Sequence, residues 1–318
     1  MPYNIAIIGG GQIGSRYLQG MVKSVIPLNI FVVDPSEKSI GICNERWIEA
    51  GGEGSIQQLQ LMNSISTLPK EIEIAIIATS ADERIRSSGK LALHAKVRYW
   101  ILEKILATSL LDMDLITEIT QKSEFSWVNT PRRMMLWHQE LVKKIAPQSP
   151  SKVFISGGDW GLACNSIHFI DFSSFLFNEN IILVETHDLD CNWYGSKREG
   201  FFEVNGKLIV KFKNDKKLVM ECFKSSNPIK IIIETVEGSW EINENTGKAI
   251  SPYGDCVYGD LESQSGMTSR LVESIINTGV CDLPSLANSI GLHKPYLEAL
   301  LKHWNQMNNT DDILLRIT

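Results

Sequence analysis

The sequence predicts an α/β plus α+β protein: a doubly wound parallel sheet in the first part and a mainly antiparallel sheet in the second. Two observations predict this order. Up to about residue 120, short β-branched apolar runs alternate with longer amphipathic stretches, as in βαβ units around a buried parallel sheet. Beyond a Pro/Ser break at residues 147–151, strand-like segments follow one another without helices, which implies antiparallel pairing.

The first part contains five expected strands, each followed by small or turn-forming residues. They are residues 4–8, 30–33, 74–78, 100–102 and 125–129. The pattern changes from about residue 132, where a helix is expected at 134–145. We therefore predict two domains, residues 1–131 and residues 132–318.

The second part contains six expected strands and two hairpin turns. The strands are residues 181–186, 200–204, 208–212, 218–223, 229–235 and 239–242. Asn205-Gly206 and Asn214-Asp215 are hairpin signals. Helical periodicity returns at 283–304, and 311–318 is expected to be a last strand. Because a large open sheet must be covered on both faces, we expect a homodimer or homotetramer through this sheet.

Composition excludes several function classes. The 318 residues suffice for about two domains. With 31 Lys+Arg against 37 Asp+Glu, the net charge of -6 argues against nucleic acid and acidic membranes as partners. No apolar run is long enough to cross a bilayer. Six cysteines without a CxxC pair argue against a metal site or a disulfide framework, so we expect a soluble, cytoplasmic protein.

Residues 9–14, GGGQIG, match the dinucleotide-binding pattern G-x-G-x-x-G directly after a strand and at the start of a helix. Gly9 would make the tight turn, Gly11 would let the backbone approach a pyrophosphate, and Gly14 would let helix and strand pack closely. Gln12 and Ile13 begin the helix, whose free N–H groups would bind the phosphates.

Asp34 ends the second strand, twenty residues beyond Gly14. A carboxylate there can accept hydrogen bonds from the adenosine ribose and repels a 2′-phosphate, so we predict NAD as the cofactor. Lys38 lies close by in the sequence and keeps NADP open as the alternative. The competing interpretation is a glycine turn that serves packing alone, with Asp34 as a helix N-cap.

Further motifs follow the later strands in a recognisable order. They are Ala-Thr-Ser at 78–80, Glu103-Lys104, Asn129, Arg132-Arg133 and His168-x-x-Asp171. Together with the glycine turn, this series resembles the Gfo/Idh/MocA family of glucose-fructose oxidoreductase and inositol dehydrogenase relatives. The resemblance implies a Rossmann domain, a second domain with a large open antiparallel sheet, and NAD(P)-dependent oxidation or reduction of CH–OH groups on sugars, cyclitols or nucleotide sugars.

The resemblance also assigns cofactor contacts to Thr79, Ser80, Glu103 and Asn129, and a catalytic role to Lys104. At the carboxyl end of a parallel strand, an ammonium group can hydrogen-bond a substrate hydroxyl and stabilise a developing alkoxide. Glu103 would orient Lys104 or contact the nicotinamide ribose. The family's Glu-Lys-Pro is not matched in full, because isoleucine follows Lys104. Without the resemblance, a surface ion pair at a strand end is the simpler interpretation.

His168 is the second predicted catalytic residue, as acceptor of the hydroxyl proton. Asp171 lies on the same helix face and would hold the imidazole or bind a sugar hydroxyl. Arg132 and Asn165 are the other expected substrate contacts. The family's acid, four residues before the histidine, falls on Cys164. The alternative is a partly buried histidine capped by a neighbour in its own helix.

Two functions follow from these residues. The first is an NAD-dependent dehydrogenase in carbohydrate metabolism, with a small sugar-like substrate. The second is a sensor or partner protein of the same fold, which binds nucleotide and sugar with little or no chemistry; the cysteine at position 164 and the missing proline support it.

Overall fold

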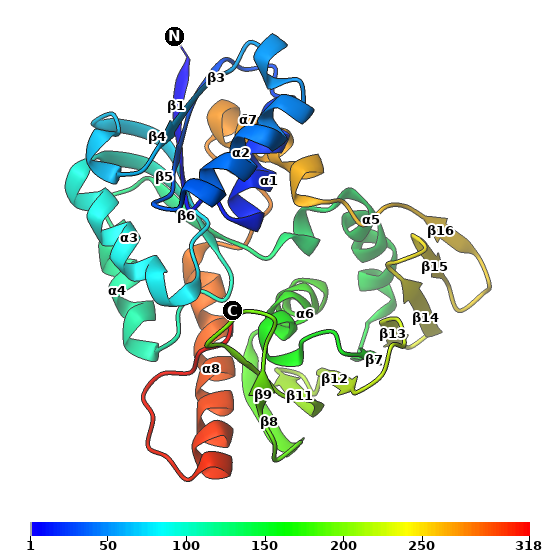
Figure 1. Cartoon of the computed structure of the whole chain (residues 1–318). Helices are drawn as coiled ribbons and strands as arrows, with labels where there is room; N and C mark the ends of the chain where they lie inside the picture. The colour runs from blue at the N-terminus through cyan, green and yellow to red at the C-terminus, as the bar shows by residue number, and fades with distance from the viewer. Residues whose placement is uncertain (1) are drawn as a thin grey trace. The chain divides into compact units, whose positions relative to one another are not determined.

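The structure is a computed structural model that describes residues 2–318, and the chain divides into two compact units (Figure 1). The first unit comprises the chain up to Ala107, Leu111–Asn129 and Glu262–Leu286; the second comprises Thr108–Leu110, Thr130–Leu261 and Ala287–Thr318. One boundary after residue 131 does not describe this division, because Glu262–Leu286 returns to the first unit and packs against its first helix.

The first unit contains a six-stranded parallel sheet in the order β3-β2-β1-β4-β5-β6. Its strands are β1 (Tyr3–Ile8), β2 (Leu28–Val33), β3 (Gln58–Met62), β4 (Glu71–Ile77), β5 (Lys96–Glu103) and β6 (Phe125–Asn129). The five expected strands are present. Strand β3 was not expected, because QLQLM has little β-branched character and lies at the sheet edge. The order reverses between β1 and β4, where doubly wound sheets bind ligands.

Helices cover both faces of this sheet. They are α1 (Gln12–Met21), α2 (Glu37–Glu49), α3 (Ala81–His94), α4 (Leu110–Thr120) and α7 (Gln264–Thr278), with short 3-10 turns η1 (Gly52–Gly54) and η2 (Ile65–Thr67). Figure 1 shows α3 and α4 on one side of the strands and α1 and α2 on the other. Helix α7 packs against α1, where a Cβ on Gly20 would lie 2.5 Å from the carbonyl oxygen of Ser265. The predicted Rossmann architecture is therefore confirmed.

The second unit contains an eight-stranded sheet in the order β16-β15-β14-β13-β7-β12-β11-β8. Its strands are β7 (Lys152–Gly158), β8 (Ile181–Leu189), β11 (Gly206–Phe212), β12 (Lys217–Phe223), β13 (Lys230–Thr235), β14 (Gly238–Asn243), β15 (Lys248–Ile250) and β16 (Cys256–Tyr258). Neighbours are antiparallel apart from β7 and β12. The predicted open, mainly antiparallel sheet is confirmed, although β7 at its centre was missed because it ends in two glycines.

Of the two expected hairpins one is present, whereas the other hairpin and the expected last strand are absent from the described residues. Asn214 and Asp215 both have φ of 56° and close the β11–β12 hairpin. Asn205-Gly206 forms no hairpin, because β10 (Phe202–Glu203) pairs with β9 (Tyr194–Gly195). Residues 311–318 form no strand; their backbone bonds are scattered, as where Leu315 donates to the carbonyl of Thr108.

Three helices complete the second unit: α5 (Leu136–Ile145), α6 (Leu162–Phe177) and α8 (Leu286–Asn308), with 3-10 turns η3 (Pro131–Met134) and η4 (Ala146–Gln148). Helix α6 is mostly apolar and mostly buried, as expected of a helix inside a core. Within residues 2–318, none of the helices is long and apolar enough to span a bilayer.

Candidate active site

The glycine turn joins β1 to α1 in very close packing. Gly9 has φ of 99°, in the left-handed region, and a Cβ there would lie 2.9 Å from the carbonyl carbon of Ala78. A Cβ on Gly14 would lie 1.8 Å from the carbonyl oxygen of Gly9. Both positions therefore require glycine, as the motif predicts.

Gly11 differs from these two positions, because a Cβ there would meet no atom of the described chain within 4 Å. Gly11 is the N-cap of α1 and has no side chain that could cap the helix. The N–H groups of Gln12 and Ile13 in the first turn therefore receive no hydrogen bond from an N-cap side chain. Arg46 donates to the carbonyl (3.0 Å) and the side-chain oxygen (2.8 Å) of Gln12, which adds positive charge. This open, electropositive cradle fits a pyrophosphate.

Asp34 is fixed beside the cradle by two backbone donors. Its carboxylate accepts from the N–H of Gly10 at 2.7 Å and from the N–H of Ser36 at 2.8 Å. The N-cap of α2 is Ser36, whose hydroxyl accepts from Ser39, so the alternative of Asp34 as the N-cap is wrong. Each carboxylate oxygen has a second lone pair, which leaves capacity for ribose hydroxyls.

The remaining residues expected at the cofactor lie at the same edge of the sheet. Thr79 and Ser80 follow β4, Glu103 ends β5, Lys104 follows it, and Asn129 ends β6. Because these strands run parallel to β1, their carboxyl ends share one edge with the glycine turn. The first unit thus gathers every residue that the sequence assigned to the cofactor.

Glu103 and Asn129 form part of a buried hydrogen-bond network. Glu103 accepts from the Tyr17 hydroxyl at 2.8 Å and from the Asn129 amide at 2.7 Å. The same amide donates to Gln264 of α7 at 2.9 Å. Burial raises the pKa of Glu103, whereas its two donors oppose the shift. In this structure, both residues have protein partners and brace α1, β5, β6 and α7 together.

Lys104 is partly exposed, although Glu103 and Ile105 on either side are buried. The Lys104–Ile105 peptide bond is cis. The following carbonyls of Ile105 and Leu106 accept hydrogen bonds from Arg84, a residue that the sequence analysis missed.

Arg84 lies in α3 and its side chain is almost fully buried. The buried stripe of this helix also contains Ala81, Ser88 and Leu91. An arginine that falls at helical spacing on the same face as small and apolar residues is the sequence pattern that could have indicated a buried Arg84.

In the second unit, His168 lies on a partly exposed stripe of α6 together with Cys164 and Asn165. Ile167 and Phe169, its sequence neighbours, are buried. The amide of Asn165 donates to the carbonyl of Trp160 at 2.7 Å. The imidazole is thus positioned by a rigid, well-packed helix.

The N-terminus of α6 is capped by a buried carboxylate that the sequence did not indicate. Glu203 of β10 accepts from the N–H of Ala163 at 2.8 Å and from the N–H of Cys164 at 3.1 Å. A carboxylate at this end complements the helix dipole and fixes the first turn, one turn before His168.

Two of the three expected substrate contacts are instead held in buried ion pairs. Asp171 is 1% exposed, and its carboxylate binds Arg133 at 2.9 and 2.5 Å. Arg132 makes two 2.8 Å bonds to Glu244. Asp171 cannot be reached by a substrate and does not hold the imidazole, and the charge of Arg132 is already neutralised; neither is retained as a substrate contact.

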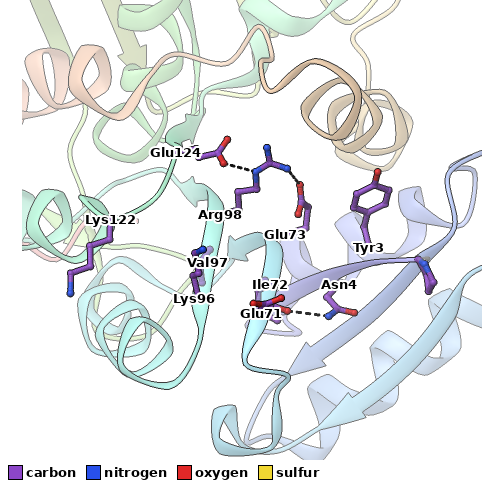
Figure 2. A pocket seen from close by; sticks show the side chains of 11 residues that line it. Tyr3, Asn4, Glu71, Ile72, Glu73, Lys96, Val97, Arg98, Lys122 and Glu124 are labelled. Carbon is purple, nitrogen blue, oxygen red and sulfur yellow. Dashed lines mark hydrogen bonds and ion pairs between the residues drawn. The ribbon is translucent and has the colours of Figure 1, made fainter.

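A hollow of about 360 Å³ lies at the opposite edge of the first unit's sheet, near the amino ends of the strands (Figure 2). Arg98 there reaches the carboxylates of Glu73 and Glu124, each at 2.8 Å. Hydrogen bonds from Arg98 and from the hydroxyl of Tyr99 hold the pKa of Glu124 below its usual range. The charge of Arg98 is thus paired with these two carboxylates, and this edge is not the one where parallel sheets bind nucleotides.

No family model matches the sequence, and no curated protein matches it. Solved structures do match over nearly the whole chain. An oxidoreductase from Agrobacterium radiobacter in complex with NAD+, L-tartaric acid and magnesium is 14% identical with a TM-score of 0.72, covering 96% of this chain and 97% of that one.

Two further structures give similar values. A UDP-N-acetylglucosamine 3-dehydrogenase from Acidithiobacillus ferrooxidans is 12% identical with a TM-score of 0.71, covering 94% of this chain and 97% of that one. A scyllo-inositol dehydrogenase from Lactobacillus casei, with bound NAD(H) and scyllo-inositol, is 12% identical with a TM-score of 0.68 and the same coverages. These likenesses confirm the fold that the family resemblance predicts.

Proposed function

We propose that this chain is an NAD-dependent dehydrogenase that converts a secondary alcohol of a sugar, cyclitol or nucleotide sugar to the ketone, or the reverse. The observation that carries the proposal is the one sheet edge that combines an open glycine cradle, Asp34 and the part-exposed Lys104. Structures of the same fold contain NAD with scyllo-inositol or L-tartaric acid, both polyhydroxylated compounds, which supports this substrate class.

The roles of the residues follow from their chemistry. The glycine turn would hold the pyrophosphate, and Asp34 the adenosine ribose. Bound NAD+ supplies the acceptor for the hydride that leaves the carbinol carbon. Lys104 would hydrogen-bond the substrate oxygen and stabilise its developing charge, while His168 would accept the hydroxyl proton. Asn165, on the same stripe as His168, remains the proposed substrate contact.

The binding-protein function is the second candidate, and Cys164 favours it. A thiol stands one turn before His168, where the family's acid would stand, and it is a poor substitute for a carboxylate in proton transfer near neutral pH. Such a protein would keep the glycine cradle and Asp34 and would bind the nucleotide without turnover.

The test uses the purified full chain. NADH binding is measured by calorimetry, and turnover by nicotinamide absorbance with a panel of inositols, sugars, sugar acids and nucleotide sugars. Lys104→Ala and His168→Ala should each lower kcat by about 10²-fold or more. Lys96→Ala, at the exposed start of the same strand β5, and His187→Ala, also exposed, are matched controls that should keep full activity.

Each outcome selects one function. Binding with turnover that both substitutions abolish supports the dehydrogenase. Binding without turnover of any panel member supports the binding protein. No affinity for NADH or NADPH contradicts both, and turnover that survives both substitutions contradicts the assigned residues.

We also propose that the second unit's sheet mediates self-association. On its face opposite the buried Val153 and Ile155, four part-exposed apolar side chains lie side by side across neighbouring strands, in the order Ile232, Phe154, Val219 and Ile209.

Ion pairs border this apolar row. They are Lys152–Glu234, Lys207–Glu221, Lys211–Glu185 and Lys230–Glu241. Because the bordering side chains carry both signs of charge, a second copy related by a two-fold axis can place its lysines opposite the glutamates of the first copy and its glutamates opposite the lysines. Phe154→Glu should convert a dimer or tetramer to a monomer in light scattering, while Val236→Glu, at a turn where Val236 is 80% exposed, should not. A wild-type chain that is monomeric at micromolar concentration would contradict this proposal.

A further inference from the structure

We infer that Arg84 is a positioning residue, which ties the turn bearing Lys104 to the turn bearing Thr79. This inference rests on the proposed function for its catalytic consequence, but its structural part can be tested without turnover. Arg84 touches neither reacting atoms nor solvent, because it is 1% exposed.

The geometry places one guanidinium group between two strand ends. One terminal nitrogen of Arg84 donates to the carbonyl oxygens of Ile105 and Leu106, the latter at 3.1 Å, directly after Lys104. The other terminal nitrogen donates at 2.6 Å to the carbonyl of Thr79, the second residue after β4. The two turns are therefore cross-linked by one side chain from α3.

Arginine suits this place for a physical reason. A guanidinium is planar and presents its donors in a fixed fork. Hydrogen bonds to two carbonyl groups on one turn and one on the other therefore set the orientation of the guanidinium, and the rigid guanidinium holds the two turns at a set distance from each other. An ammonium is a compact point charge without such a fork and cannot hold both turns in one plane. Burial raises the pKa of the nearby Glu103 carboxyl, and the positive charge of Arg84 is one of the groups that oppose this rise, so the two buried groups favour each other's charged form.

The functional consequence concerns the two groups on these turns. Thr79 and Ser80 are expected at the cofactor, and Lys104 at the substrate oxygen. A displacement of about 1 Å in a catalytic group can cost about 10²-fold in rate. A single side chain that sets the backbone of both turns therefore sets the position of Lys104 relative to the cofactor.

The first experiment is amide hydrogen exchange on the full chain, read by mass spectrometry. Arg84→Met should raise exchange in peptides spanning residues 79–81 and 104–108 by about tenfold or more, while peptides from β1 and β2 stay unchanged. Arg86→Met is the matched control, because Arg86 lies on the same helix but is exposed and paired with Glu83. If Arg84→Met does not fold, the same exchange measurement is made on Arg84→Lys.

The second experiment is a double-mutant cycle on kcat. In the wild-type background, Arg84→Met should lower kcat by about 10²-fold. In the Lys104→Ala background, it should lower kcat by no more than about twofold, because the group that it positions is already absent. Arg84→Lys should recover part of the loss.

The outcomes separate this inference from the proposed function. Unchanged exchange in both turns, or additive effects of Arg84→Met and Lys104→Ala, would overturn the role of Arg84. Absence of NADH binding would instead overturn the proposed function, and full activity of Lys104→Ala would overturn the role assigned to Lys104. In either case the exchange result would still decide whether Arg84 holds the two turns.

Discussion

Two glycines of the same motif should respond in opposite ways to one added methyl group. In Gly14→Ala, the new Cβ would lie 1.8 Å from the carbonyl oxygen of Gly9, whereas side-chain Cβ contacts below 3.0 Å essentially do not occur. Helix α1 must therefore move from β1 by about 1 Å, and overpacking of this kind costs about 3 kcal/mol. For a domain of this size, we expect the Tm to fall by about 6 to 12 °C.

Gly11→Ala is the matched substitution. The φ of Gly11 is -64°, which alanine adopts freely, and the methyl group meets no atom of the described chain within 4 Å. Stability should fall only by about 0.5 to 1 kcal/mol, from the weaker N-cap. The methyl group would occupy the cradle instead, so the Kd for NADH should rise by about 10²-fold.

Calorimetric unfolding and NADH titration of both variants and the wild type form one experiment. Gly14→Ala with a wild-type Tm would show that α1 does not pack on the turn as described. Gly11→Ala with wild-type affinity would show that no pyrophosphate lies over Gly11, and the cofactor assignment would then be wrong.

Two other predictions concern carboxylates. Asp34→Asn keeps an oxygen for the N–H of Gly10 but loses the charge, so the preference for NADH over NADPH should fall by about tenfold in titrations; an unchanged ratio would place the ribose elsewhere. Although Glu244 is buried, Arg132 and His138 hold the pKa of its carboxyl well below the ordinary 4.5. The ionised carboxylate therefore contributes its full stabilisation of the fold above pH 4.5, and this contribution is lost as the pH falls toward the lowered pKa. Glu244→Gln should therefore lower the free energy of unfolding in urea by about 3 to 5 kcal/mol near neutral pH and by less below pH 4.5; a difference independent of pH would contradict the ion pair.

The sequence by itself determined the features that depend on local geometry. The strands β1, β2 and β4 follow from unbroken apolar runs, and the cradle follows from glycines at fixed spacing after β1. Lys104 was placed at the carboxyl edge because parallel strands bring their ends to the same side. Each of these inferences needs only neighbouring residues and the handedness of a βαβ unit.

Only the tertiary structure decided which polar residues face each other. Arg132 and Asp171 are polar residues near a predicted site, and the sequence gives no sign that Glu244 and Arg133 neutralise them from 112 and 38 residues away. The return of α7 to the first unit and the cross-link through Arg84 are equally non-local. Periodicity records which face of an element is buried, but the partner across a buried contact is set by the packing of segments that the chain order does not bring together.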